Sequence, residues 1–242
     1  MKITICFLAL VLTLTKISIG QSVIDYQTGS GIEIQPGADV CADQVNINGA
    51  FSGGGSICGN VVYVMNLTAF IQGFYNSTTD KMVRDTARVY LRSIIAPYSI
   101  IDSSISILDT TGVGTFIFFN DVNGINYYIV LKHRNSIETW SNVGYTFSSN
   151  SLTYNFTSAS SKAFGDNQIL IDNTPARFAI YGGDVNQDDV VDGSDIAIID
   201  NNAFSFVTGY VKSDVNGDDV VDGSDAAIAD NNAFNFVGMI RP

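Results

Sequence analysis

The feature that most constrains this chain is a duplicated acidic segment near its C-terminus. Residues 184–207 return 30 positions later as residues 214–237, and only four of the 24 aligned pairs differ. The differing pairs are Gln187/Gly217, Ile196/Ala226, Ile199/Ala229 and Ser205/Asn235. Self-similarity at a fixed period indicates two copies of one structural unit. We therefore expect the C-terminal part to fold as two equivalent repeats.

Each repeat spaces its oxygen-bearing side chains as a calcium loop does. These side chains fall at positions 1, 3, 5, 9 and 12 of a twelve-residue loop, and a valine at position 7 is placed to give its backbone carbonyl. An all-oxygen set favours calcium over zinc or copper, and clustered carboxylates are unfavourable without a cation. We predict two bound Ca²⁺ ions. The expected ligands are Asp184, Asn186, Asp188, Val190, Asp192, Asp195, Asp214, Asn216, Asp218, Val220, Asp222 and Asp225.

The apolar residues of the repeats predict a short helix after each loop. Val191 and Val221 stand at position 8, where paired calcium loops can join their backbones. Asp195 and Asp225 also suit the positive end of the helix that follows. At position 6 an aspartate replaces the usual glycine, so Asp189 and Asp219 are expected to adopt a positive φ. One buried helix face is expected from residues at helical spacing, namely Ile196, Ile199, Ala203 and Phe206.

Residues 182–242 resemble a type I dockerin domain. The resemblance rests on the two loop-helix repeats, on aspartate at position 12, and on the opening Gly183 to Asn186, which reads Gly-Asp-Val-Asn. It implies that the repeats fold on calcium and present a helical face to a cohesin-like protein module, which docks proteins onto a scaffold or cell surface. In that family, positions 10 and 11 carry much of the partner choice. Here they are Gly193, Ser194, Gly223 and Ser224.

Charge divides the chain sharply. Of the 24 acids, 12 lie in the last 62 residues with only two bases, whereas residues 1–180 carry 12 acids and 10 bases. This shift predicts a boundary near residues 181–183, where paired glycines are expected to form a flexible joint. A solvated acidic tail is the alternative, but it does not account for the repeat or the interleaved Val, Ile and Phe. The net charge of −12 argues against a nucleic-acid binder.

The first 60 residues predict export and a disulfide. Residues 1–20 open with Lys2, continue with an apolar run and end on small residues, which is typical of a signal peptide. Lys16 ends that run before spanning length, so we expect no transmembrane segment in the mature chain and a secreted or cell-surface location. Cys41 and Cys58 are expected to pair in an oxidising compartment, within a stapled strand segment over residues 21–60. A metal-binding or reactive thiol pair is disfavoured, because Cys41 and Cys58 lack the close spacing and the histidine neighbours of such sites.

Residues 61–180 predict an all-β sandwich, so the expected fold is a sandwich followed by a small α-helical domain of two calcium loop-helix repeats over residues 181–242. Apolar and polar residues alternate over residues 87–92, and residues 112–132 read as two strands around an Asn-Gly turn. Shorter candidates cover residues 61–71, 153–157 and 177–181, with turn residues between them. The Gly-x-Gly-x-Phe-x-Phe run at 112–118 resembles prealbumin-like β-sandwich modules of bacterial surface proteins.

No catalytic residues are predicted. Residues 61–180 offer no spaced carboxylate pair and no Gly-x-Ser-x-Gly elbow, although Ser-His-Asp chemistry through His133 stays open. The polar run from Lys132 to Trp140 could form a ligand-binding rim, but we favour a solvated strand end with Trp140 closing the core.

We therefore expect a secreted, non-catalytic protein that docks through calcium. Its repeats would attach the β-sandwich to a cell surface or to an extracellular polysaccharide-degrading assembly, and the polysaccharide context is what the dockerin resemblance implies. Alternatives are a carbohydrate-binding or adhesive module, a small hydrolase, or repeats that act only as a rigid spacer.

Overall fold

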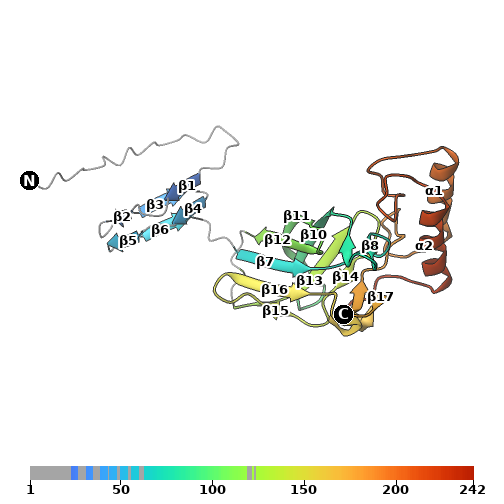
Figure 1. The fold of residues 1–242 in the computed structure, drawn as a ribbon. Helices are drawn as coiled ribbons and strands as arrows, with labels where there is room; N and C mark the ends of the chain where they lie inside the picture. Colours follow the sequence, from blue (N-terminus) through green and yellow to red (C-terminus); the bar gives the residue numbers. More distant parts are fainter. Residues whose placement is uncertain are drawn as a thin grey trace, which may run out of the picture. The chain divides into compact units, whose positions relative to one another are not determined.

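The computed structural model describes residues 63–242 apart from 119–121 and 123, together with the strands within residues 23–59 (Figure 1). The chain divides into two compact units, residues 1–60 and Val61–Pro242. Within the described part, none of the helices is both long enough and apolar enough to cross a membrane. The expected signal peptide, residues 1–20, lies outside the described residues.

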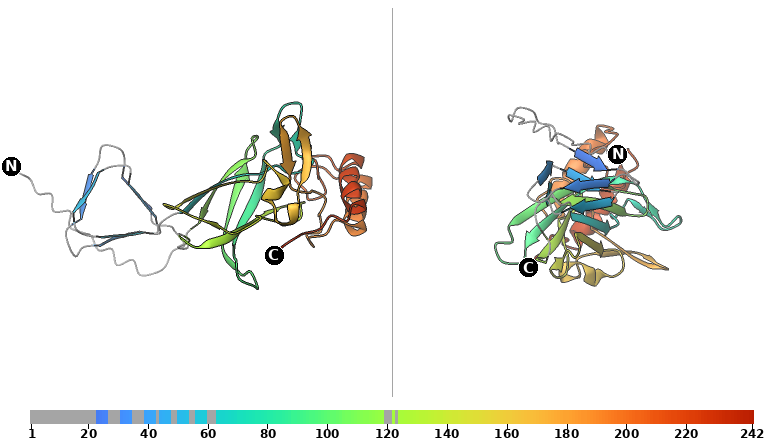
Figure 2. Two further views of the ribbon diagram at one scale, coloured as in Figure 1. Left: turned by 90° about the horizontal axis from the view of Figure 1, so that it is seen from below. Right: turned by 90° about the vertical axis from the view of Figure 1, so that its left-hand side faces the viewer.

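The described residues of the first unit form six strands of four residues in three parallel pairs, β1 with β4, β2 with β5 and β3 with β6. Because each of the first three strands pairs with the third strand after it, the strands stack in two turns of a three-sided coil, as the left view of Figure 2 shows. The strands are Val23–Tyr26, Gly31–Ile34, Asp39–Ala42, Gln44–Ile47, Ala50–Gly53 and Ser56–Gly59. The register sets Cys41 opposite Cys58. Cys41 is disulfide-bonded, and its pairing with Cys58 stays a prediction.

The second unit begins with two sheets that form the predicted β-sandwich. One sheet has the strand order β11-β10-β13-β14, with β15 also paired to β13, and the other has the order β12-β7-β16. These strands are β7 Tyr63–Thr68, β10 Asp85–Ser93, β11 Ile100–Leu108, β12 Val113–Phe118, β13 Asn126–His133, β14 Thr139–Trp140, β15 Tyr145–Thr146 and β16 Ser151–Asn155.

Smaller elements complete the second unit. Two hairpins join β8 (Tyr75–Asn76) to β9 (Lys81–Met82) and β17 (Ile169–Asn173) to β18 (Ala176–Ala179). Two short 3-10 turns follow β16, at Ser160–Lys162 and Phe164–Asp166. The chain ends in the two helices of the repeats, α1 (Gly193–Phe204) and α2 (Gly223–Phe234).

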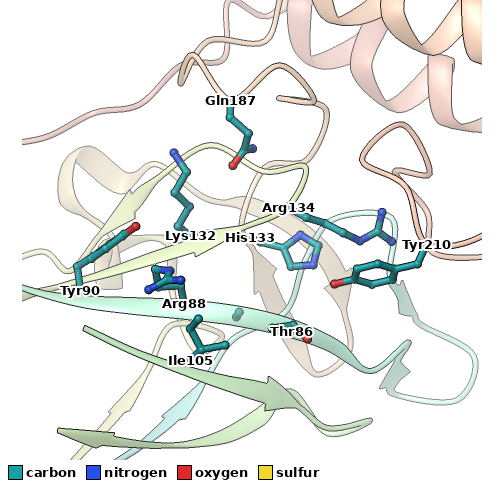
Figure 3. A pocket seen from close by; sticks show the side chains of 10 residues that line it. Thr86, Arg88, Tyr90, Ile105, Lys132, His133, Arg134, Gln187 and Tyr210 are labelled. Carbon is teal, nitrogen blue, oxygen red and sulfur yellow. The ribbon is translucent and has the colours of Figure 1, made fainter. Parts of the chain in front are cut away.

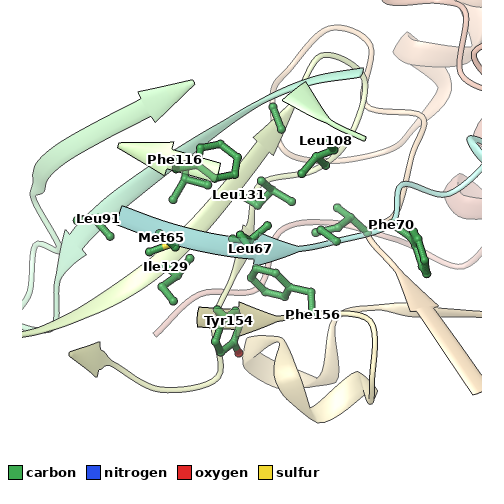
Figure 4. Packing of buried hydrophobic residues seen from close by; sticks show 14 of the residues in the cluster. Met65, Leu67, Phe70, Leu91, Leu108, Phe116, Ile129, Leu131, Tyr154 and Phe156 are labelled. Carbon is green, nitrogen blue, oxygen red and sulfur yellow. The ribbon is translucent and has the colours of Figure 1, made fainter. Parts of the chain in front are cut away.

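The core of the sandwich lies between the facing sides of the two sheets (Figure 4). Along β10 the residues Ala87, Val89 and Leu91 are buried while the residues between them are half-buried, as the alternation predicted. Residues 112–132 do form two strands, but these belong to different sheets and do not pair. β12 pairs with β7 and β13 pairs with β10, because the burial of both strands on the same core outweighs the local turn preference.

A second core holds the two repeats together. Its buried members come from both loops, both helices and the sandwich, and they are Ile137, Val185, Val191, Ile199, Val215, Val221, Ala229 and Val237. The helices contact each other and lie side by side in Figure 1. Phe206 was expected on the buried face but lies beyond α1 and is 88% exposed. The helix ends at Phe204, so the helical spacing no longer places Phe206 on that face.

The position 8 valines join the repeats in a different way from the one expected. Val191 donates its backbone N–H to Val237 O at 2.9 Å, and Val221 donates to Val207 O at 3.0 Å. Each loop thus bonds to the segment that follows a helix, rather than directly to the other loop. The exchange is reciprocal between the repeats, because loop 1 bonds to the end of repeat 2 and loop 2 to the end of repeat 1.

The expected flexible joint at residues 181–183 is instead a bonded connection. Gly182 donates to Gln72 Oε1 at 3.1 Å and accepts from Asn232 Nδ2 at 2.7 Å. Gly183 donates to Asn135 O at 2.7 Å. Nearby, Gly73 has φ +86° and lies so close to Val215 that a Cβ there would come within 2.6 Å of the Val215 carbonyl oxygen. The sandwich and the repeats therefore form one compact unit.

We predict that Ile137→Ala destabilises the repeats although Ile137 belongs to the sandwich. Ile137 is fully buried in the repeat core, so its truncation should lower the free energy of unfolding by about 2–5 kcal/mol. Urea unfolding of the full chain, followed by Trp140 fluorescence and by the helical circular dichroism signal, measures this. Ile105→Ala is the matched control because Ile105 is 53% exposed. Equal losses in the two variants would contradict the packing described.

Candidate functional site

Each calcium-like loop is built into the start of the helix that follows it. Asp192 caps α1 by accepting from Ser194 N–H, while the Asp195 side chain accepts from the backbone N–H of Asp192. This reciprocal capping box satisfies backbone donors that a helix start leaves free. Asp222 and Asp225 make the same arrangement at α2. Positions 9 and 12 therefore fix both the loop and the helix.

The carboxylates at positions 1 and 12 of the first loop are wholly buried and held by backbone donors. Asp195 Oδ1 accepts from the N–H groups of Val185 and Asn186 at 2.9 and 3.1 Å, and its Oδ2 accepts from Asp192 N–H at 3.0 Å. The Asp184 oxygens accept from two later N–H groups of the loop, each at 3.1 Å. These bonds wrap the loop around its own acidic side chains.

Three of the predicted ligands of the first loop meet at one point. Oxygens of Asp184, Asp188 and Asp195 all lie within 4.8 Å of one another. The Asn186 side-chain oxygen lies beside them and accepts from Asp188 N–H at 2.8 Å. The Asp192 carboxylate is not part of this group, because it caps α1. The cluster offers hard oxygen donors only, which fits a calcium ion.

The second loop repeats this pattern with one difference. Asp214 and Asp225 are buried, and Asp225 Oδ1 accepts from the N–H groups of Val215 and Asn216 at 2.6 and 3.0 Å. Within the part of the chain that the structure describes, the one group of three acidic oxygens at such short range is that of the first loop. The second loop therefore has the same frame with a wider spacing of its carboxylates.

Burial makes the charge on these aspartates unfavourable. It raises the pKa of Asp184 to about 6, and the neighbouring Asp195 and Asp189 carboxylates add to that rise, although backbone N–H donors oppose it. Burial likewise raises the pKa of Asp225. A divalent cation between the carboxylates would offset this cost. The residues present thus fit the ion that the sequence predicted.

The residues at loop position 6 adopt the backbone that calcium loops require. Asp189 has φ +69° and Asp219 has φ +66°. An aspartate tolerates this left-handed region better than most residues other than glycine. An aspartate in place of the usual glycine at position 6 thus leaves the loop shape intact. This confirms the positive φ expected from the spacing.

A cation from the sandwich reaches the second loop, and sequence reasoning missed it. Arg134 pairs with Asp85 at 2.8 Å and with Asp214 at 3.3 Å, and it also donates to Val211 O. Asn135 Nδ2 donates to the Asp214 backbone oxygen at 2.7 Å. The loop itself carries no base, so the only signal in the sequence is the polar run after β13. Arg134 partly neutralises a predicted ligand of the second ion.

Asp85 anchors the other end of this network. Burial raises the pKa of Asp85, but contact with His133 and hydrogen bonds from Tyr210 and Arg134 outweigh that effect and hold the pKa well below its ordinary value. Tyr210 donates to Asp85 Oδ1 at 2.6 Å, so the segment between the repeats is tied to the first residue of β10. His133 Nε2 lies 3.2 Å from Asp85 Oδ2 but without hydrogen-bond alignment.

The predicted partner-binding residues are exposed at the starts of the helices. A Cβ added to Gly193 or Gly223 would meet open space. The hydroxyls of Ser194 and Ser224 are already used, since each donates to the capping aspartate of its helix at 2.7 Å. A set of exposed aromatic residues lies at the ends of the helices and just beyond them, and the loop spacing does not predict it. It comprises Phe204, Phe206, Phe234 and Phe236, which are 85%, 88%, 82% and 93% exposed.

The run from Lys132 to Trp140 divides between two roles. Lys132, His133 and Arg134 line a pocket beside the first calcium-like loop (Figure 3). Trp140 is 1% exposed and donates its indole N–H to Glu138 Oε1 at 2.9 Å. The interpretation of Trp140 as a buried residue that closes the fold is therefore confirmed, and its ring is not free to stack on a ligand.

No protein-family model and no curated protein matches this chain. Two solved structures are similar to this chain, and each match covers 72% of it. One is a C-terminal interface mutant of a type II Cohesin-X-Dockerin complex from Acetivibrio cellulolyticus, 99% of whose matched chain is covered at 13% identity and a TM-score of 0.43. The other is an N-terminal interface mutant of that complex, covered over 97% of its chain at 12% identity and a TM-score of 0.39.

We predict that, without calcium, the full chain loses stability as pH rises from about 4 to about 6. Asp184 has a folded-state pKa of about 6, above its ordinary value of 3.8. A raised acid pKa favours folding below the unfolded value and loses that effect as pH rises through the folded one. Thermal melting in a chelating buffer measures the slope, and Asp184→Asn should reduce it while Asp200→Asn should not. An unchanged slope in Asp184→Asn would contradict the assignment.

Proposed function

We propose that this protein is a non-catalytic docking protein whose duplicated repeats bind two calcium ions and present their helices to a protein partner. The observation that carries the proposal is the cluster of Asp184, Asp188 and Asp195 oxygens within 4.8 Å, in a loop that caps its own helix. Because the same residues hold the loop and start the helix, binding of an ion would fix the position of the helix.

The two loops would bind calcium with unequal affinity. In the first loop, Asp184, Asp188 and Asp195 are already close, and Asn186 lies beside them. In the second, Arg134 lies 3.3 Å from Asp214 and repels a cation there. We therefore expect the first loop to bind calcium more tightly than the second.

The docking surface would be the outer face of the helices and the segments that follow them. Large aromatic residues dominate the energy of protein interfaces and are seldom left in water without a role. Phe204 and Phe234 occupy equivalent places in the two repeats, as do Phe206 and Phe236, and all four are more than four-fifths exposed. The aromatic residues supplement the four residues expected at positions 10 and 11. A cohesin-like module is the partner that the dockerin resemblance implies.

The sandwich would be the part that is delivered. Because it packs on the repeats through Ile137, Gly73 and Gln72, it would be held at a fixed orientation to the partner. The extracellular location and the association with polysaccharide breakdown remain part of the proposal and rest on the expected signal peptide and the dockerin resemblance. Carbohydrate binding by Trp140 is disfavoured, since that residue is buried.

Calcium binding is tested by calorimetry on the full chain. We expect about two equivalents of calcium and much weaker binding of magnesium, which prefers a smaller octahedral site. Asp188→Ala and Asp218→Ala should each remove about one equivalent. Asp200→Ala is the control because Asp200 is exposed on α1, outside the loop. Two intact sites in either loop variant would contradict the ligand assignment.

Docking is tested with an immobilised type I cohesin module. We expect the full chain to be retained in calcium and released by a chelator, because the helices are positioned by the ion. The double variant Phe204→Ala with Phe234→Ala should weaken retention at least tenfold, whereas Val143→Ala, at a residue 52% exposed on the sandwich, should not. If the chain remains bound in the presence of the chelator, the docking proposal is contradicted.

A further inference from the structure

A pocket of about 310 Å³ opens where the sandwich meets the first repeat. Its floor is the outer face of β10 and β13, and its walls come from the first calcium-like loop and from the segment between the repeats (Figure 3). The side chains used below are Arg88, Tyr90, Lys132, Gln187 and Tyr210. The volume is at the lower end of the range for small-molecule sites, so the pocket suits a ligand about the size of one sugar ring.

Two basic residues stand on neighbouring strands in the floor of this pocket. Arg88 of β10 and Lys132 of β13 are direct partners in the antiparallel register. Like charges directly opposite each other destabilise a sheet. An anion placed between the two side chains would turn this repulsion into attraction. The sheet therefore carries a local cost that a bound anion removes.

A neighbouring carboxylate relieves the repulsion only in part, and only at Lys132. Within the described residues, Arg88 forms no ion pair, and its guanidinium lies 5.8 Å from the centre of the Tyr90 ring. Lys132 Nζ forms an ion pair with Asp189 Oδ1 at 3.7 Å, a distance longer than that of a charge-assisted hydrogen bond. Both cations keep donors for a ligand, and both side chains are half-buried.

Three other polar side chains around the pocket are already engaged by neighbouring groups. Arg134 is used by Asp85, Val211 O and Asp214. Gln187 donates to Asp184 O at 2.7 Å and is thereby fixed to the calcium-like loop. Tyr210 donates to Asp85. The basic groups left for a ligand are Arg88, which has no ion pair among the described residues, and Lys132, whose one ion pair is long.

We propose that this pocket binds a compact oxyanion, a carboxylate or a phosphate group on a sugar-sized molecule, between Arg88 and Lys132. The guanidinium of Arg88 donates two parallel hydrogen bonds to such a group, and the Lys132 ammonium neutralises it from the opposite strand. The Tyr90 ring provides a flat wall for the body of the ligand. The site is separate from the ion ligands and from the exposed phenylalanines.

Calorimetry on the full chain in excess calcium tests the proposal. The probes are galacturonate, which carries a carboxylate, and glycerol phosphate, which carries a phosphate, with galactose and glycerol as neutral controls. We expect at least one anion to bind at millimolar concentration or below and neither neutral molecule to bind. The tighter anion identifies the group. Absence of binding by both anions, or equal binding of the neutral molecules, overturns the site.

Three variants locate the binding. Arg88→Gln and Lys132→Gln should each weaken the anion about tenfold, and added sodium chloride should weaken it in the unmodified protein. Arg84→Gln is the matched control, since Arg84 is exposed just before β10 and does not line the pocket. Equal weakening by Arg84→Gln overturns the proposal.

The stability of Arg88→Gln provides a second readout that does not need the ligand. Because the substitution removes a like-charge pair, its melting temperature should equal or exceed that of the unmodified protein. A marked fall in melting temperature would show that Arg88 is needed for folding, and that result also overturns the proposal.

Discussion

The second unit depends on buried aspartates whose own loops contain no basic residue. Asp184 and Asp195 in the first loop and Asp225 in the second have no exposed surface. Their oxygens accept hydrogen bonds from backbone N–H groups of their loops. A carboxylate in such a place is costly unless hydrogen bonds and a neighbouring positive charge compensate it. The backbone donors shape the loop and start the helix, and the missing positive charge explains why an ion is expected.

The same constraint links the repeats to the sandwich. The segment after β13 sends Arg134 to Asp214 and places Ile137 inside the repeat core. One short stretch of chain thus supplies both a compensating charge and an apolar side chain to the neighbouring module. Because these contacts are buried, the two parts behave as one unit, and a partner held by the helices would receive the sandwich in one orientation. The pocket beside Lys132 exists only because of this packing.

Much of the candidate site could be predicted because its information is local. A twelve-residue loop carries nearly all its own ligands, so spacing alone placed Asp184, Asp188 and Asp195 together, and the backbone at Asp189 followed from its position in the loop. Arg134 could not be predicted, because it lies 80 positions from Asp214 and no local pattern relates the two. The opposition of Arg88 and Lys132 was equally hidden, since a strand pattern gives the face of a residue but not its cross-strand neighbour.

The sequence by itself determined the elements: alternation predicted β10, and the repeat predicted two loop-helix units. It also predicted a core-facing Trp140, because large apolar side chains at strand ends are usually buried. Only the tertiary structure decided that β12 and β13 enter different sheets, and that the glycines at 182 and 183 are bonded rather than free. The physical reason is the separation of the contacting residues along the chain, since periodicity and spacing give information only about residues that are close in sequence. The pairing of strands, the reach of Arg134 and the burial of Ile137 depend on residues that meet only after folding.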